Sequence, residues 1–245
     1  MDKKKGKILI LVEGARTDLR LMKHLLRIYE IDSRHEIVSY NTNIYTLYST
    51  MFKGVDNPAD LDILQHLKEH EPDAGKKKLF DERFSDILLV FDLDPHAPDF
   101  SADKIIEMAT FFVESSDMGK LYINYPMVES FYHMKSIPDP DYCSYQVSLN
   151  ELRGGGYKAR VNAETRNHDY SKFAIDKGEC NIVIGQNLEK ARRIMSVEAD
   201  RIGMQTPDLI SVLKKQLAML RELDAVDILC TCAFYIPDYN PRLIH

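Results

Sequence analysis

The sequence predicts an α/β fold in which helices lie on both faces of a mostly parallel sheet, with a helical elaboration at the C-terminal end. Two apolar runs, residues 7–12 and 86–91, have the length and composition of strands buried on both faces. A third run covers residues 120–125. Segments with helical spacing alternate with these runs, an order typical of parallel sheets.

Composition and charge limit the kinds of protein to which this chain can belong. The 245 residues are 44% hydrophobic and 29% charged, as in a globular chain with a sizeable core. We expect an α/β core over residues 1–136 and a second part, residues 137–245, packed on it. The net charge of −6 argues against unspecific coating of nucleic acid, which depends on Lys and Arg, but permits a local basic groove.

The sequence contains few motifs that indicate a cellular location or a role for its cysteines. No apolar run approaches the roughly 18 residues of a membrane-spanning helix, so we expect a cytoplasmic protein without membrane contact. The four cysteines include no Cys-x-x-Cys pair, which argues against a zinc ribbon and a thioredoxin-like site. Cys230 and Cys232 are predicted to be small core residues.

Carboxylates follow all three apolar runs. Glu13 ends the first run, Asp92 and Asp94 end the second, and Glu129 lies shortly after the third. Parallel strands end at one edge of a sheet, so Glu13, Asp92 and Asp94 are expected to share one space. Their repulsion then requires a cation or a bound proton, and oxygen ligands favour Mg²⁺ first and Mn²⁺ second. Two unrelated strands with polar ends are the alternative.

The helices can be placed from spacing and capping residues. Apolar residues from 19 to 29 predict a helix after Gly14, with Asp18 in its first turn as a dipole-complementing residue or an inward-pointing ligand. Residues 35–40 predict a further strand, and Ser101 caps a helix that ends near residue 114. Residues 126–133 predict a helix with residues 129 and 133 on one face, as a surface ion pair or beside the other acids.

Two histidine motifs have competing interpretations. A helix opening at Asn57 contains His66 and His70, which match the H-x-x-E-H pattern of some zinc peptidases. No third ligand is evident, so a solvated helix face is favoured, followed by a polar turn at residues 73–78. His96, in the loop after Asp94, either contacts phosphate, transfers a proton or is simply exposed.

The second half of the chain contains a basic, glycine-rich segment at residues 152–160. Three successive glycines let backbone N–H groups approach a phosphate, and Tyr157 could stack on an unpaired base, whereas a surface hinge is the alternative. The basic residues of this patch are Arg153, Lys158, Arg160, Arg166 and His168. Helices are predicted at residues 188–199 and after Asp208, then a closing strand at residues 227–236 on the edge of the sheet.

Together these motifs resemble the Toprim domain of topoisomerases, bacterial primases, the nuclease that matures 5S ribosomal RNA and OLD-family nucleases, and most closely its RloB-like branch. The resemblance covers roughly residues 7–195. Its motifs are Glu13-Gly-Ala-Arg-Thr17-Asp18, Phe91-Asp-Leu-Asp-Pro-His96, Asn124-Tyr-Pro-Met-Val-Glu129 with His133, and Gly156-Tyr-Lys158. Two positions depart from the pattern: Thr17 stands where many members carry an acid, and Leu93 stands where a basic residue is common in the branch.

The resemblance implies a Toprim-like catalytic core and Mg²⁺-dependent cleavage of phosphodiester bonds in DNA or RNA, tRNA included, as an effector of anti-phage defence. The implied catalytic residues are Glu13, Asp92, Asp94, Glu129 and Lys158. The implied metal ligands are Glu13, Asp18, Asp92 and Asp94. We assign nucleic-acid binding to Arg153, Lys158, Arg160 and Arg166. The alternative is a non-catalytic subunit of a defence complex that binds nucleic acid or a nucleotide; a regulatory partner protein and a homo-oligomer are left open.

Overall fold

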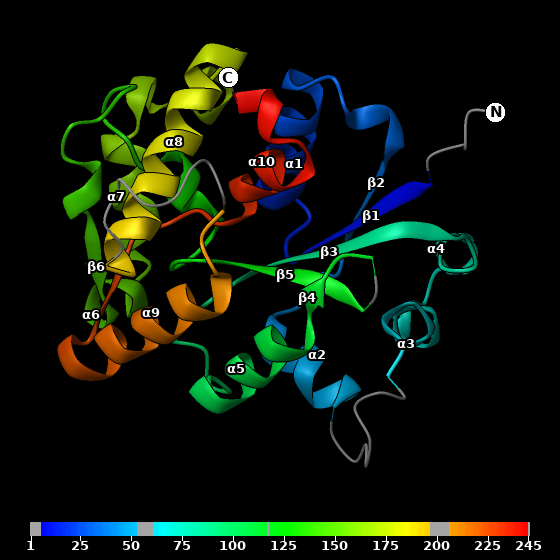
Figure 1. Ribbon diagram of the computed structural model, residues 1–245. Coiled ribbons are helices and arrows are strands. Elements are labelled where there is room, and N and C mark those ends of the chain that lie inside the picture. Colours follow the sequence, from blue (N-terminus) through cyan, green and yellow to red (C-terminus); the bar gives the residue numbers. More distant parts are fainter. Residues whose placement is uncertain (1–5, 53–60, 117, 197–205, 245) are drawn as a thin grey trace.

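The computed structural model describes residues 6–52, 61–116, 118–196 and 206–244. At its centre is a five-stranded sheet with the order β2-β1-β3-β5-β4 (Figure 1). The first four of these strands run parallel, and β4 pairs antiparallel with β5. The strands are β1 (Lys7–Val12), β2 (His35–Ser39), β3 (Phe84–Asp92), β4 (Val113–Glu114) and β5 (Gly119–Asn124). This confirms the predicted α/β fold with a mostly parallel sheet.

Helices lie on both sides of the sheet (Figure 1). On one side are α1 (Thr17–Ile28) and α10 (Tyr235–Tyr239), and on the other are α2 (Ile44–Met51) and α5 (Ala102–Phe111). α1 buries its apolar side chains and leaves its charged side exposed. Ser101 caps α5 as predicted, although the helix ends at Phe111 because the chain continues into β4.

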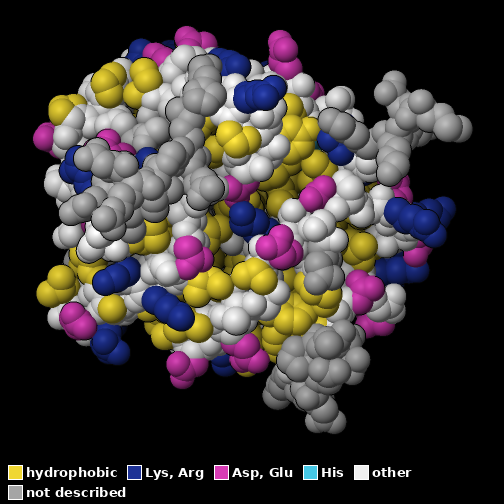
Figure 2. All heavy atoms as spheres, in the orientation of Figure 1, with side chains coloured by type: hydrophobic (Ala, Val, Ile, Leu, Met, Phe, Trp, Pro, Cys, Tyr) yellow, Lys and Arg dark blue, Asp and Glu magenta, His cyan; other side chains and the backbone are white. Residues whose placement is uncertain are grey.

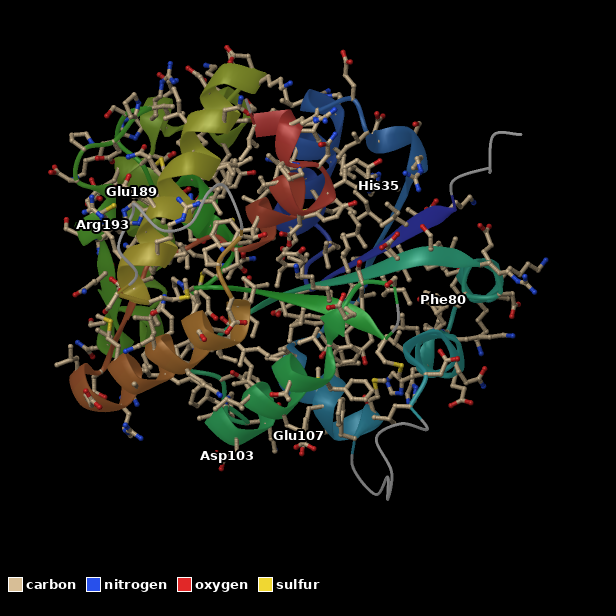
Figure 3. All side chains as sticks on the ribbon, viewed as in Figure 1. His35, Phe80, Asp103, Glu107, Glu189 and Arg193 are labelled. Carbon is tan, nitrogen blue, oxygen red and sulfur yellow. The ribbon has the colours of Figure 1, made fainter. Side chains whose placement is uncertain are left out.

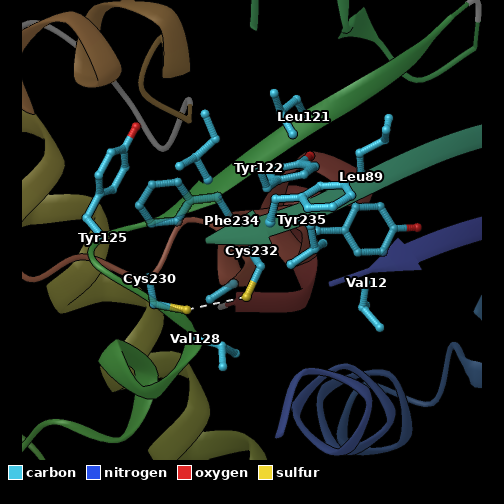
Figure 4. Close-up of a cluster of buried hydrophobic side chains, with 14 of the residues drawn as sticks. Val12, Leu89, Leu121, Tyr122, Tyr125, Val128, Cys230, Cys232, Phe234 and Tyr235 are labelled. Carbon is cyan, nitrogen blue, oxygen red and sulfur yellow. Dashed lines mark hydrogen bonds between the residues drawn. The ribbon is translucent and has the colours of Figure 1, made fainter. Parts of the chain in front are cut away.

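The core extends from the sheet into the C-terminal segment. Residues 8–12 of β1 and 87–91 of β3 are buried without alternation, since helices cover both faces. Figure 4 shows Cys230 and Cys232 among buried side chains of the sheet and the C-terminal segment, with their sulfur atoms 3.4 Å apart. Both cysteines are free and fully buried, which confirms their prediction as core residues. One hydrophobic core therefore contains residues from both parts of the chain.

The second half is mostly helical. Its elements are β6 (Gln146–Ser148), α6 (Leu149–Arg153), α7 (Gly156–Glu164), α8 (Lys177–Ile194), α9 (Leu209–Leu223) and β7 (Ala225–Asp227). Asp208 caps α9 as predicted, whereas α8 begins near residue 177, because Asp176 caps it there. Glu189 and Arg193 form an ion pair on the outer side of α8 (Figure 3).

Short 3-10 helices connect the longer elements. They are η1 (Asp32–Arg34), η3 (Val128–Tyr132), η4 (Tyr142–Ser144), η5 (Arg166–His168), η6 (Tyr170–Lys172), η8 (Cys232–Phe234) and η9 (Pro241–Ile244). Within the part of the chain that the structure describes, no helix is both long and apolar enough to cross a membrane.

The prediction of a closing strand at residues 227–236 is wrong. Among the described strands, β7 pairs with β6 alone, in a separate two-stranded sheet, and not with an edge of the central sheet. Beyond β7, a single bridge between Leu229 and Tyr125 joins this segment to the end of β5, and the chain then forms η8 and α10. Backbone N–H groups of this segment donate hydrogen bonds to the side-chain oxygens of Asn124 and Asn187, and not to the carbonyls of a neighbouring strand.

The predicted helix at residues 126–133 is the 3-10 helix η3. With three residues per turn, side chains four apart do not share a face. Glu129 and His133 accordingly contact different partners, Lys158 and Glu164, so they form no ion pair with each other.

Two further helices lie before β3. α3 (Ile63–His70) begins after its cap Asp62, and the predicted cap Asn57 lies outside the described residues. The predicted polar turn contains α4 (Ala74–Leu79), because the Asp73 side chain accepts a hydrogen bond from a backbone N–H of its first turn.

Candidate metal centre at the carboxyl ends of the strands

A cavity of about 460 Å³ opens where β1 and β3 end. Its walls come from the turn after β1, the start of α1, the end of β3, η3 and α7. The ionisable side chains that line it are Glu13, Arg16, Asp18, Asp92, Asp94, Glu129 and Lys158. The register of the parallel strands pairs Val12 with Val90, so β3 extends only two residues beyond β1 at this edge, and the carboxylates at their ends lie together.

Glu13 and Asp92 lie side by side although 79 positions separate them. The backbone N–H of Glu13 donates a hydrogen bond of 3.0 Å to the carbonyl of Val90 on β3. The Glu13 carboxylate accepts a hydrogen bond of 3.1 Å from the backbone N–H of Asp92. The end of β1 is therefore fixed against the end of β3.

Asp92 is only 9% exposed and is supported from β5. The Asn124 side-chain amide donates a hydrogen bond of 3.3 Å to its carboxylate. Asn124 in turn accepts a hydrogen bond of 3.2 Å from the backbone N–H of Cys232, which ties the site to the C-terminal segment. This supporting role of Asn124 is not evident from the sequence, although the residue lies near the end of a predicted strand.

Asp94 belongs to the turn after β3. Its φ of 40° is left-handed, a conformation that Asp adopts more readily than most residues. The Tyr45 hydroxyl donates to the carbonyl of Leu93 at 2.5 Å, and the Asp94 N–H donates to the carbonyl of Pro126 at 3.3 Å. These bonds hold the turn so that Asp94 faces the same cavity as Asp92.

Asp18 is buried in the first turn of α1 and lines the cavity. Its Oδ1 atom has no hydrogen-bond partner among the described residues. This position matches the inward-pointing interpretation and not that of an exposed residue at the helix start. Gly14 permits it, because a Cβ at residue 14 would lie 2.5 Å from Oδ2 of Asp18.

Glu129 and Lys158 complete the cavity, and Lys158 enters it from the second half of the protein. Glu129 is buried on η3, and its Oε1 lies 3.2 Å from Nζ of Lys158 on α7. Its Oε2 has no partner among the described residues. Burial opposes protonation of Lys158, but Glu129, Asp92 and Asp94 together outweigh it and raise the pKa of the ammonium group.

Burial and mutual repulsion raise the pKa of four carboxyls in the cavity. Burial raises the pKa of Glu13 to about 8, and the charge of Asp94 adds to this effect. Burial raises the pKa of Asp18 to about 6, with a contribution from Glu129. Burial, and then the charges of Asp18 and Glu13, raise the pKa of Asp92 well above its usual range; burial also raises that of Asp94. The cavity therefore concentrates negative charge that its own cations do not balance.

The cavity fits a hard divalent cation by donor type and charge. All the acidic donors are carboxylate oxygens, and Asp18 and Glu129 each present one oxygen that has no hydrogen-bond partner in the described part of the chain. No three His, Cys, Asp or Glu side chains within the described ranges already stand at metal-ligand spacing.

The predicted glycine-rich loop is mostly helical. α6 and α7 occupy its two ends, and only residues 154–155 remain as a turn, in which Gly155 has a φ of 68° that favours glycine. Tyr157 is buried within this segment, so the prediction that it stacks on an exposed base is wrong.

The predicted basic residues differ in their acidic partners. Lys158 faces the carboxylates, whereas Arg160 pairs with Glu151 and Glu164, and Arg166 pairs with Glu179. Arg153, the remaining residue predicted to bind nucleic acid, is exposed and forms no ion pair with another described residue. A role of Arg153, Arg160 and Arg166 in nucleic-acid binding stays a prediction.

The predicted histidines lie outside the cavity. His96 is exposed, and Nε2 of the buried His133 is 2.9 Å from Glu164. His168 is also exposed. His66 and His70 face each other on α3 with ring centroids 4.2 Å apart, but no third potential ligand among the described residues completes a zinc site. The favoured interpretation as a solvated helix face holds for His70 but is wrong for His66, which is buried.

Comparison with known proteins identifies no relative: no family model, no curated protein and no solved structure matches this chain.

Proposed function

We propose that this protein is a Toprim-type nuclease that cleaves phosphodiester bonds in DNA or RNA with Mg²⁺ or Mn²⁺, as an effector of anti-phage defence. The observation that carries the proposal is the meeting of Glu13, Asp18, Asp92, Asp94 and Glu129 in one cavity. Such a set of buried oxygen donors is suited to divalent cations, and phosphoryl chemistry commonly depends on such ions. The motifs that resemble the Toprim domain supply the reaction class.

Each residue then has a distinct task. Asp92, Asp94 and Asp18 would hold the cation, which when bound polarises the scissile phosphate and lowers the pKa of attacking water. Glu13, which accepts a hydrogen bond from the backbone N–H of Asp92, would join them as a ligand or exchange a proton with the reacting oxygens as general acid/base. Lys158 offers a positive charge at the rim for a phosphate oxygen.

Cleavage of labelled single-stranded DNA, single-stranded RNA and tRNA in Mg²⁺ or Mn²⁺ tests this proposal. We expect Glu13→Gln and Asp92→Asn each to reduce the cleavage rate by about 100-fold or more, because Asp92→Asn removes a charge that holds the cation and Glu13→Gln removes a carboxyl that binds the cation or transfers a proton. Glu189→Gln, on the exposed outer side of α8, is the matched control and should cleave like the wild type. Equal cleavage by wild type and Asp92→Asn would contradict the proposal.

A non-catalytic binding subunit is the second candidate. The observation that favours it is that no preformed ligand set stands among the described residues, while Lys158 already compensates Glu129. In that case the wild type binds the same oligonucleotides without cutting them, and Glu13→Gln and Asp92→Asn bind equally well.

A further inference from the structure

The exposed side of α1, together with the residue that precedes it, carries a stripe of four cations that the nuclease mechanism does not use. Arg16, Arg20, Lys23 and Arg27 recur every three or four residues, so they share one face of the helix. All four are exposed, and none forms an ion pair with another described residue. Elsewhere the charges are mixed: on the face shown in Figure 2, acidic and basic side chains are interspersed.

This stripe lies along a groove that leads to the carboxylate cavity. The groove has a volume of about 880 Å³ and is lined by all four cations, against two carboxylates, Asp32 and Glu36. Ala15 and Arg16 line both the groove and the carboxylate cavity, so the two spaces adjoin at the start of α1. A chain of phosphates along α1 would therefore reach the proposed metal centre directly.

Stacked aromatic rings form another part of the groove wall. Tyr132 and Tyr170 stack with centroids 4.1 Å apart and planes 2° from parallel. Tyr132 is buried, while Tyr170 is only partly buried, so the core holds the outer ring in a fixed orientation. An aromatic plane beside cations is a platform for an unpaired base, which a duplex does not present.

We infer that the α1 groove, defined by Arg16, Arg20, Lys23, Arg27 and Tyr170, binds a single nucleic-acid strand and guides it into the carboxylate cavity. The four cations span about 16 Å along the helix at 1.5 Å per residue, which is enough for several consecutive phosphates. This inference rests on the proposed nuclease function, because it assigns the substrate form and its path to that site.

Fluorescence anisotropy with labelled 20-mers in EDTA measures binding without cleavage. We expect wild type to bind single strands more tightly than blunt duplexes, and R20A/K23A to lower the slope of log K against log salt by about 1.4, at roughly 0.7 per lost phosphate contact. Tyr170→Ala should weaken single-strand binding about tenfold, whereas Tyr170→Phe should retain it. K214A/K215A removes two exposed lysines of α9 and is the charge-matched control, with an unchanged slope.

Three results would overturn the inference: wild-type binding by R20A/K23A, equal binding of duplex and single strand, or binding of anionic vesicles but not oligonucleotides. Melting curves of each variant confirm that it is folded. The cleavage assay separates this inference from the proposed function. A protein that binds through the groove but never cuts contradicts the nuclease alone, whereas wild-type cutting by R20A/K23A contradicts the groove alone.

Discussion

The carboxylates of the cavity are shielded from water, and burial makes their ionised form energetically unfavourable. Asp92 sits at the end of a core strand, within reach of Glu13, Asp18 and Asp94, and receives a side-chain hydrogen bond from Asn124. Without a cation, such groups are expected to bind protons at pH values at which exposed carboxyls have lost them. The stability of the metal-free protein should therefore depend on pH.

We predict that the metal-free protein loses stability as pH rises from about 4.5 to 8. Folding raises the pKa of Glu13 from 4.5 to about 8 by burial, so within this window the folded state binds more protons than the unfolded state. The free energy of unfolding then falls with increasing pH, and Asp18 acts in the same direction up to about pH 6. Melting temperatures measured in EDTA across this range test the sign.

Glu13→Gln provides the control for this pH dependence. Because Gln does not titrate, the melting temperature of the variant should fall less steeply than that of the wild type between pH 5 and 8. Identical slopes for the two proteins would show that Glu13 does not carry the effect.

At the scale of elements, the unit formed by β1, its turn and α1 places two of the acids. The turn brings Asp18 so close to Gly14 that a methyl group at residue 14 would displace its carboxylate. We predict that Gly14→Ala weakens Mn²⁺ binding about tenfold, as is typical when the surroundings of a ligand are disturbed. Gly154→Ala, where a Cβ meets nothing within 4 Å, is the control and should bind Mn²⁺ like the wild type. Calorimetric titration measures both, and equal affinities would contradict the account of this turn.

The elements around the site show which parts of the fold the sequence patterns could predict. β1 and β3 are buried on both faces and therefore appear as continuous apolar runs, and the periodicity of α1 follows from its single buried side. Residues 227–236 form an equally apolar run but no long strand. Their backbone N–H groups donate hydrogen bonds to the side chains of Asn124 and Asn187, which are distant in the sequence. Such long-range side-chain bonds leave no local signal in the sequence.

At the scale of the whole molecule, the site depends on both parts of the chain. Lys158 enters from α7, and the Thr231 hydroxyl donates a hydrogen bond of 2.7 Å to the carbonyl of Ile123 at the end of β5. The acids could be predicted to meet because they follow parallel strands. The α1 groove was missed, because a charged helix side is also typical of ordinary solvent exposure and only the fold shows that it borders the cavity.

Titration of metal-stripped protein with Mn²⁺ by isothermal calorimetry tests the central claim, that these distant carboxylates jointly bind a divalent cation. We expect saturable binding by the wild type and by Glu189→Gln, and a loss of affinity of about tenfold or more in Asp92→Asn and Asp18→Asn. Absence of saturable binding by the wild type, or wild-type affinity in Asp92→Asn, would contradict it.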